Sequence, residues 1–171
     1  DQVMRRSESG QYDVLPSTGD LTAAEVEILS VDDKEFVLSN LLQSVANHYD
    51  FILIDCPPSL SMLTINALAA ANGVIVPIQC EYYALEGLSA LMNTIARVAD
   101  TINQDITIEG LLRTMYDPRN SLTNDVSDQL MQHFGERVYR TVIPRNVRLA
   151  EAPSHGEQVL AYDKQSKGAI A

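Results

Sequence analysis

The sequence contains no hydrophobic run long enough to cross a bilayer. Its longest apolar stretches, such as 67–71 and 73–78, are far shorter than the roughly 20 residues that a membrane-spanning helix needs. The first residues also lack the charged and then apolar layout of a secretory signal. We therefore expect a cytoplasmic protein. With 171 residues, 46% hydrophobic and 20% charged, the chain has the composition of one ordinary folded domain over 1–171.

Cysteine and histidine are also scarce. Cys56 and Cys80 each follow a predicted strand and have no metal-ligand spacing, so we expect two reduced, partly buried structural thiols. His48, His133 and His155 are isolated from any metal-binding or Ser-His-Asp arrangement. The sequence therefore predicts neither a Cys/His metal centre nor a catalytic triad.

Basic residues are few and unevenly distributed. The net charge of −11 argues against indiscriminate attraction to nucleic acid. Residues 1–108 contain 15 acidic and 4 basic residues, whereas residues 109–171 contain 8 of each. The late part is rich in arginine, whose planar guanidinium suits phosphate oxygens, although a solvated surface explains these residues as well. These arginines are Arg113, Arg119, Arg137, Arg140, Arg145 and Arg148.

One motif is missing although its usual companion is present. No run of the form G-x-x-x-x-G-K-[S/T], which would cradle phosphates, occurs in the sequence. Residues 51–54, however, are continuously apolar and rich in β-formers, which predicts a buried strand, and Asp55 follows them. A carboxylate in this place suits magnesium, although Asp55 can also simply cap the following turn. We therefore expect the chain to be the back portion of a larger nucleotide phosphatase.

The predicted elements alternate between strands and helices. This alternation is typical of βαβ units and predicts an α/β fold, with a mostly parallel sheet and helices on both faces. We expect this three-layer, Rossmann-like sheet to be incomplete at the N-terminus. The predicted strands are 12–17, 51–55, 73–77, 106–114 and 138–143. The first predicted helix starts after Asp20, and the next ones span 31–48, 63–71, 85–102 and 123–134. A short helical turn is predicted at 147–150, and another helix begins at 166–169.

Taken together, these segments resemble the ParA/Soj family of chromosome- and plasmid-partitioning ATPases, a deviant branch of the P-loop proteins related to MinD. The resemblance covers nearly the whole chain, and runs of this length in the order of the family are specific. It is carried by 12–17 with Asp20, Leu21 and Thr22, by 50–60 and 63–68, by 77–88, by the Thr-Met-Tyr-Asp run 114–117, and by 143–154.

The resemblance implies roles for the segment around Asp55. Asp55 corresponds to the Walker B acid, which is catalytic and reaches Mg2+ through water, and Cys56, Pro57, Pro58 and Ser59 correspond to the switch loop that senses the γ-phosphate. The phosphate loop of the family has no counterpart in these residues, so we expect an ATPase whose fragment, as given, is inactive. The family places the strand of that loop beside the strand of Asp55, which implies a gap flanked by apolar strand edges.

The resemblance also implies two binding surfaces. The adenine of ATP or ADP is expected at Thr114, Met115 and the loop of Pro144, Arg145 and Asn146. Sequence-independent DNA binding by an ATP-bound homodimer is expected at two arginines, with weak binding for this fragment alone. The implied partner is a centromere-binding, ParB-like protein that stimulates hydrolysis, and the implied location is the nucleoid within the cytoplasm, without a membrane. The two arginines are Arg119 and Arg148.

Two other functions remain open. A MinD-like membrane-cycling regulator of cell division would carry a carboxyl-terminal amphipathic helix that docks on lipid. The run 144–149 and the two arginines favour DNA instead. A non-catalytic interaction module is the other alternative.

Tyr82 and Tyr83 suggest a stacking platform for bases, but paired aromatics entering a helix more often anchor a core or an interface, and we expect a structural role.

Overall fold

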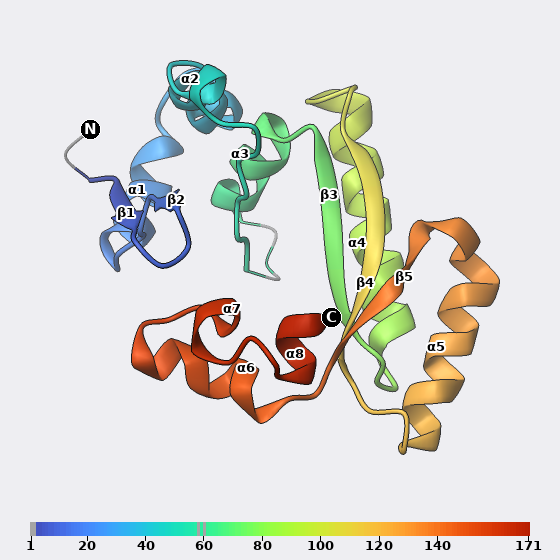
Figure 1. Ribbon diagram of the computed structural model, residues 1–171. Coiled ribbons are helices and arrows are strands. Elements are labelled where there is room, and N and C mark those ends of the chain that lie inside the picture. The colour runs from blue at the N-terminus through green and yellow to red at the C-terminus, as the bar shows by residue number, and fades with distance from the viewer. Residues whose placement is uncertain (1–2, 58, 60) are drawn as a thin grey trace. The chain divides into compact units, whose positions relative to one another are not determined.

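The computed structural model describes residues 3–57, 59 and 61–171, which divide into two compact units. The first unit comprises Asp1–Pro16, Ile75–Gly87 and Gly110–Ala171, and the second comprises Ser17–Val74 and Leu88–Glu109. Figure 1 labels the elements. The strands are β1 (Arg5–Ser7), β2 (Tyr12–Val14), β3 (Gly73–Gln79), β4 (Thr107–Tyr116) and β5 (Val138–Pro144). The α-helices are α1 (Asp20–Ile28), α2 (Val37–Leu42), α3 (Met62–Ala70), α4 (Ala84–Thr101), α5 (Ser121–Phe134), α6 (Val147–Glu151), α7 (Val159–Tyr162) and α8 (Lys167–Ile170). The 3-10 turns are η1 (Lys34–Phe36), η2 (Ala46–His48), η3 (Gly135–Arg137) and η4 (Ala152–His155).

Strands β3, β4 and β5 are hydrogen-bonded neighbours in that order. Strands β4 and β5 pair in parallel, and Figure 1 shows β3 running in the same direction. Consecutive parallel strands need a crossover connection, and the long helices α4 and α5 supply it. The prediction of an α/β fold with a parallel sheet is therefore confirmed.

In the second unit, α3 and α4 share a core with the beginning of β3. Leu68, Val98 and Ile106 are buried together, and Val74 packs against them. Asn103, two residues after the end of α4, donates through its side chain to the carbonyls of Leu68 at 2.9 Å and Ala71 at 2.8 Å. One amide thus satisfies the last carbonyls of α3, which have no partner within the helix.

A buried asparagine joins the other helices of the second unit. Asn66 on α3 is only 3% exposed, and its side-chain oxygen accepts from the backbone N–H of Leu38 at 3.0 Å. Its amide donates to the carbonyls of Lys34 at 2.8 Å and Met62 at 3.1 Å. Because a buried amide must be hydrogen-bonded, Asn66 fixes how η1 and α2 pack on α3.

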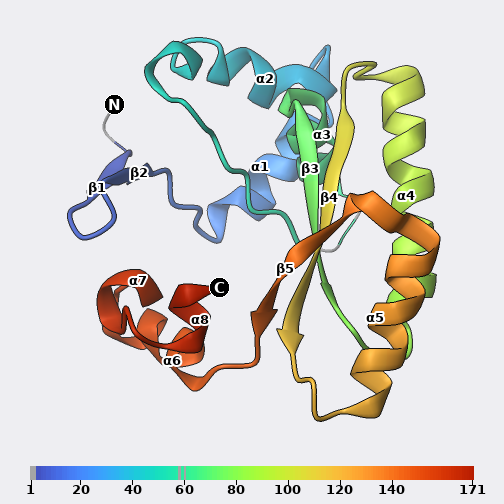
Figure 2. The same ribbon diagram turned by 45° about the vertical axis from the view of Figure 1, so that its right-hand side comes forward.

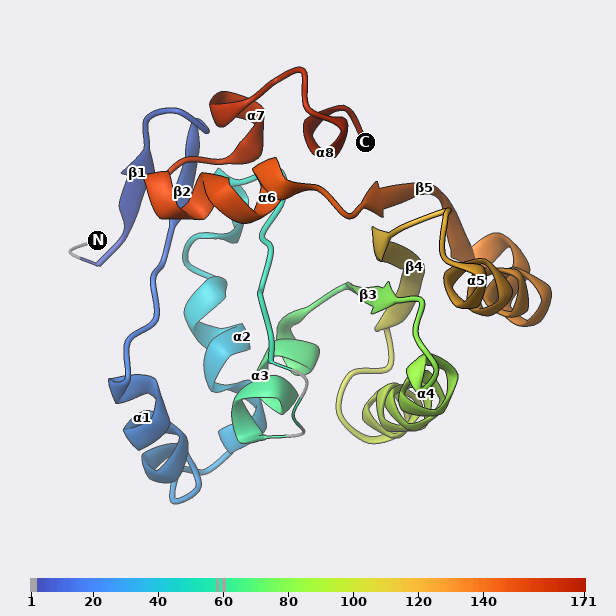
Figure 3. The same ribbon diagram turned by 90° about the horizontal axis from the view of Figure 1, so that it is seen from below.

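In the first unit, helices lie on both sides of β5. Leu111 of β4 and Leu130 of α5 are fully buried, and α5 contacts β5. Helix α8 also contacts β5, and Figures 1, 2 and 3 show the α6 to α8 cluster on the side of β5 opposite α5. Strands β1 and β2 form an antiparallel hairpin, whose Ser9 carbonyl accepts from the Gln158 side chain at 3.1 Å.

The prediction of a buried strand at 51–55 is wrong for this structure. The segment has no strand assignment, and the side chains of Phe51 and Leu53 are 86% and 88% exposed. A strand forms only where neighbouring backbone accepts and donates its hydrogen bonds, and no described strand pairs with this segment. Its apolar pattern is that of a central strand, but the described residues supply no partner strand.

The predicted helix over 31–48 is also wrong in its continuity. The segment is divided into η1, α2 and η2. Asp33 has a φ of 54°, which is left-handed and cannot continue a right-handed helix. The other long predicted helices and the late strands are confirmed, with ends shifted by at most two residues. Strand β1 was not predicted.

Candidate functional site

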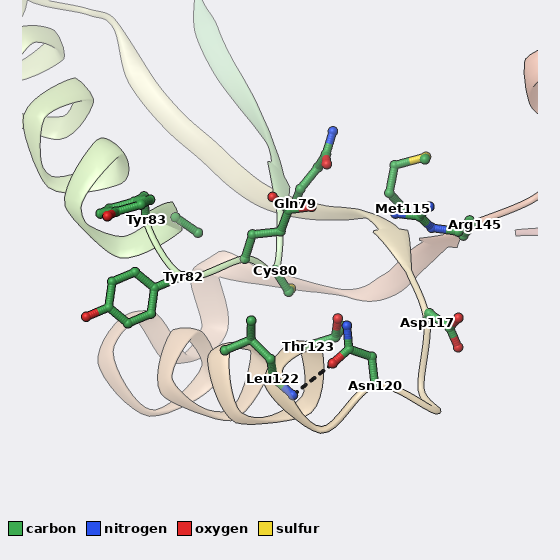
Figure 4. A pocket seen from close by; sticks show the side chains of 12 residues that line it. Gln79, Cys80, Tyr82, Tyr83, Met115, Asp117, Asn120, Leu122, Thr123 and Arg145 are labelled. Carbon is green, nitrogen blue, oxygen red and sulfur yellow. Dashed lines mark hydrogen bonds between the residues drawn. The ribbon is translucent and has the colours of Figure 1, made fainter.

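An open hollow of about 700 Å³ lies in the first unit, where β3 and β4 end. The carboxyl edge of a parallel sheet is where ligands usually bind in α/β proteins, because the loops converge there. Figure 4 shows the side chains around it. Its lining combines apolar, aromatic and charged groups: Gln79, Cys80, Glu81, Tyr82, Tyr83, Ala84, Met115, Asp117, Asn120, Leu122, Thr123 and Arg145.

The end of β4 has an irregular backbone. Arg113 pairs with Val142 and Tyr116 pairs with Pro144, so β4 has one more residue than β5 between these pairs. Met115 has a φ of 51°, and its side chain is 43% exposed and lines the hollow. A residue other than glycine with a positive φ is uncommon, and such residues cluster at functional sites. Thr114 lies outside the lining, and its hydroxyl donates to the Ile78 carbonyl at 3.4 Å.

The loop after β5 contributes one residue to the hollow. Arg145 lines it, and its backbone N–H donates to the Tyr116 carbonyl at 3.0 Å. Pro144 and Asn146 are not among the lining residues. The Asn146 side-chain oxygen instead caps α6, accepting from the backbone N–H groups of Arg148 at 2.9 Å and Leu149 at 3.4 Å. Of the five residues predicted to bind adenine, Met115 and Arg145 are therefore brought together at the hollow.

A bidentate ion pair stabilises the loop after β4. Arg119 donates from Nε to Asp117 Oδ1 at 2.9 Å and from Nη2 to Oδ2 at 2.8 Å. Hydrogen bonds from the Arg119 side chain and backbone lower the pKa of Asp117 to about 2. Tyr116 donates its hydroxyl to Asn124 at 2.9 Å, which ties the loop to α5. The arginine predicted to bind DNA is thus 87% exposed but already paired with a carboxylate.

Tyr82 and Tyr83 form the aromatic wall of the hollow. Each is 73% exposed, and their rings meet edge to face with centroids 5.0 Å apart. Neither residue therefore lies in the core, because α4 begins only at Ala84 and leaves them in the preceding turn. The other expected structural role, as an interface anchor, stays a prediction. Gln79, Glu81, Leu122 and Thr123 were not predicted as site residues, although the rule that ligands bind at strand ends pointed to the first two.

Asp55 belongs to the second unit and is exposed. The adjoining Cys56, Pro57 and Ser59 are exposed as well, whereas Pro58 and Leu60 lie outside the described residues. Partial removal from water, together with the negative charge of Asp55, raises the pKa of the Cys56 thiol. Cys56 and Cys80 are both free, as predicted, but only Cys80 is buried. An accessible carboxylate fits Mg2+, which keeps most of its water ligands and needs one or two carboxylates.

The second arginine predicted to bind DNA is also paired. Arg148 Nη1 lies 2.8 Å from Glu151 Oε2, and its Nε lies 3.3 Å from Asp163 Oδ2. The hydrogen bond to Glu151 raises the pKa of Arg148. About half of the side chain remains exposed. A phosphate would therefore have to share this guanidinium with two carboxylates.

No group of three or more His, Cys, Asp or Glu side chains in the part of the chain that the structure describes is arranged to hold a metal ion. No helix among these residues is long and apolar enough to span a membrane.

Several known proteins have sequences similar to that of this chain. The AAA domain family matches residues 1–108. An uncharacterized protein of Pseudomonas putida is 63% identical over 170 residues, and the sporulation initiation inhibitor protein Soj of Bacillus subtilis is 52% identical over 167 residues. The chromosome partitioning protein ParA of Myxococcus xanthus is 47% identical over 167 residues. The alignments cover 98% or 99% of the chain but 65%, 66% and 59% of these relatives, so the chain spans less than two thirds of each.

Solved structures with a similar fold include nucleotide-bound ones. A structure named cobyrinic acid a,c-diamide synthase, from Mycobacterium smegmatis with bound ATP analog and magnesium, is 31% identical with a TM-score of 0.78. That alignment covers 92% of the chain and 69% of the solved chain. Apo McdA of Cyanothece has a TM-score of 0.82 at 15% identity, over 95% of the chain and 66% of its own, which shows the fold alone.

Proposed function

Because the chain belongs to the ParA/Soj family of partitioning ATPases, we propose that the protein binds and hydrolyses ATP in the partitioning of a chromosome or plasmid. The observation that carries this proposal is the 52% identity to Soj over 98% of the chain, which includes Asp55 and the strand-end hollow. ATP binding is supported by the similar structure that was solved with an ATP analog and magnesium.

In this proposal Asp55 supplies the carboxylate for a hydrated Mg2+. The residue is exposed, and in the sequence it lies between the apolar residues 51–54 and two prolines at 57 and 58. When bound, the metal would neutralise the charge that develops on the phosphates. Asp55 would hold the water shell of the ion in place. Cys56, Pro57, Pro58 and Ser59 would form the loop that responds to the γ-phosphate.

The strand-end hollow would take the adenine. Met115 offers a polarizable apolar side chain to a flat base, and Arg145 lies at the same hollow. Thr114, Pro144 and Asn146 would support the shape of this edge rather than touch the base, because they do not line the hollow. The amide nitrogen of Asn146 remains a donor, whereas its oxygen caps α6.

The remaining functions follow from the family. An ATP-bound homodimer would bind DNA without sequence preference through Arg119 and Arg148, and a centromere-binding, ParB-like partner would stimulate hydrolysis. The protein would act in the cytoplasm at the nucleoid. A MinD-like role at the membrane is less supported, because a relative that is 47% identical is named a chromosome partitioning protein.

The role of Asp55 can be tested in the protein at its full natural length. We expect Asp55→Asn to lower the rate of Mg2+-dependent ATP hydrolysis by about 100-fold or more, because the amide carries no charge for the metal shell. Asp50→Asn, at an exposed aspartate of the same segment, is the matched control and should keep the rate. The measurement is steady-state phosphate release.

Different failures of this experiment have different meanings. If Asp55→Asn hydrolyses ATP as fast as the unmutated protein, the role of Asp55 is refuted. If the unmutated protein neither binds nor hydrolyses ATP, the proposed function is refuted and a non-catalytic interaction module is favoured. The 171-residue chain by itself should show no turnover, since none of its residues form a phosphate-cradling loop.

A further inference from the structure

Arg113 is a buried arginine on β4 that the proposed nucleotide site does not use. Its residue is only 9% exposed. Nη1 donates to the Ser127 hydroxyl at 2.8 Å, and Nη2 donates to the carbonyls of Tyr139 at 3.0 Å and Arg140 at 3.3 Å. Nε has no hydrogen-bond partner, and no carboxylate among the described residues pairs with this guanidinium. Arg113 thus links β4 to α5 and β5 through neutral oxygens alone.

Such a residue is costly for stability. Burying a guanidinium without a counter-ion removes it from water, and three neutral hydrogen bonds offset only part of that cost. The neighbouring buried position on the same strand, Leu111, is apolar and fully enclosed. An apolar side chain at position 113 would therefore give a more stable core. The arginine thus indicates a role other than packing.

The first observation that indicates this role is the irregular pairing of β4 with β5 on one side of Arg113. Leu111 pairs with Val138 and Arg113 pairs with Val142, so three residues of β5 lie opposite a single residue of β4. Regular ladder bonds are interrupted in such a stretch. Tyr139 and Arg140, whose carbonyls accept from Arg113, lie inside it. The guanidinium therefore replaces hydrogen bonds that a regular pair of strands would make.

The second observation is a further irregularity on the other side of Arg113. The register shifts again between Arg113 and Tyr116, and this second irregularity contains Met115 in its left-handed conformation. The Tyr116 ring lies 5.9 Å from the Arg113 guanidinium carbon, and the Tyr116 carbonyl accepts from the N–H of Arg145 at 3.0 Å. Arg113 is thus bonded across the first irregularity and packed against the second, which carries the edge of the hollow.

We propose that Arg113 is a positioning residue, whose guanidinium holds β4 and β5 in the offset register that presents Met115 and Arg145 to the strand-end hollow. The geometric part of this inference stands on the contacts of Arg113 alone. Its consequence for ligand binding rests on the proposed function, because the base is expected at that hollow. Loss of the guanidinium would let the strands relax towards a regular pairing and withdraw the two lining residues.

The test uses Arg113→Met in the protein at its full natural length, with two readouts. In hydrogen exchange, the Arg145 amide should lose protection by about tenfold or more, whereas the amide of Leu130 in α5 should keep its protection. The dissociation constant for ADP should rise by about tenfold. Arg140→Met is the matched control, since the Arg140 side chain is exposed, and it should change neither readout.

A second variant keeps the test decisive if Arg113→Met does not fold. Arg113→Lys retains the charge but replaces the planar fork by one ammonium group, so it cannot serve the same set of oxygens and should lose part of the Arg145 protection. Unchanged protection of the Arg145 amide in a folded Arg113 variant overturns the inference. Reduced protection together with no ADP binding by the unmutated protein supports the positioning role and refutes the proposed function.

Discussion

At the scale of single residues, ion pairs decide which charges are available to a ligand. Arg119 and Arg148 are the arginines that the family resemblance assigns to DNA, and each is paired with carboxylates of the same chain. Exposed pairs of this kind contribute little to stability because water and salt screen them. They do lower the local positive charge that a phosphate would meet. Sequence alone indicated the arginines but not their partners.

The Asp117 carboxyl group provides a prediction at this scale. Its folded-state pKa of about 2 lies below the ordinary value of 3.8. A depressed pKa means that the pair stabilises the fold above the ordinary value and that this contribution is lost as the pH falls towards 2. Between about pH 5 and 8 this contribution is fully present, so we expect the group to add no pH dependence to the stability there. In a carboxyl NMR titration, Arg119→Ala should return the Asp117 midpoint towards 3.8, and an unmoved midpoint would contradict the assigned cause.

At the scale of elements, close approach of β4 to β5 requires a glycine. Gly110 is buried, and a Cβ placed on it would lie 2.7 Å from the Tyr139 ring and 3.1 Å from the Arg137 carbonyl. The same strand then contains Arg113 and the irregular end at Met115. The sequence predicted strands at 106–114 and 138–143, but these local departures from regular pairing were not visible in it.

Two glycine substitutions with opposite signs test this packing. Gly110→Ala should destabilise the protein by about 1–2 kcal/mol, because the ring must turn away and the carbonyl must shift. Gly87→Ala on the exposed side of α4, where a Cβ meets no atom within 4 Å, should stabilise it by about 0.5–1 kcal/mol. Urea denaturation measures both free energies of unfolding. Equal effects of the two substitutions would show that β4 and β5 are less tightly packed than described.

At the scale of the whole molecule, the net charge of −11 opposes DNA binding while a few arginines favour it. Only a surface that gathers enough positive charge can overcome that repulsion, which is why the proposed DNA-binding species is an ATP-bound dimer. The exposed apolar residues 51–53 are a second property of the whole chain, since strand-like apolar surface left uncovered tends to attract further strands.

A salt titration tests the proposed DNA contacts. For the ATP-bound protein at its full natural length, Arg119→Ala and Arg148→Ala should each weaken binding to unrelated DNA sequences alike. Each should also lower the slope of log K against log salt by about 1, since each removes about one phosphate contact. Arg97→Ala, at an exposed arginine of α4, is the control and should leave the slope unchanged. Unaltered slopes for the first two variants would refute their assignment.

The sequence by itself determined the elements whose periodicity is complete within them. Helices α3, α4 and α5 and strands β3, β4 and β5 carry their own apolar patterns and turn residues, so local physics was enough to place them. The family signature at Asp55, at 114–117 and at 143–154 was equally readable, because it consists of residue identities.

Only the tertiary structure decided what depends on partners. Whether 51–55 forms a strand depends on neighbouring strands, and here no described strand pairs with it. Whether Asn146 faces a ligand or caps α6, and whether Arg113 lies in solvent or joins β4 to β5, depends on which oxygens and N–H groups lie nearby. Hydrogen bonds and burial are properties of pairs of groups distant in sequence, and a one-dimensional pattern does not contain them.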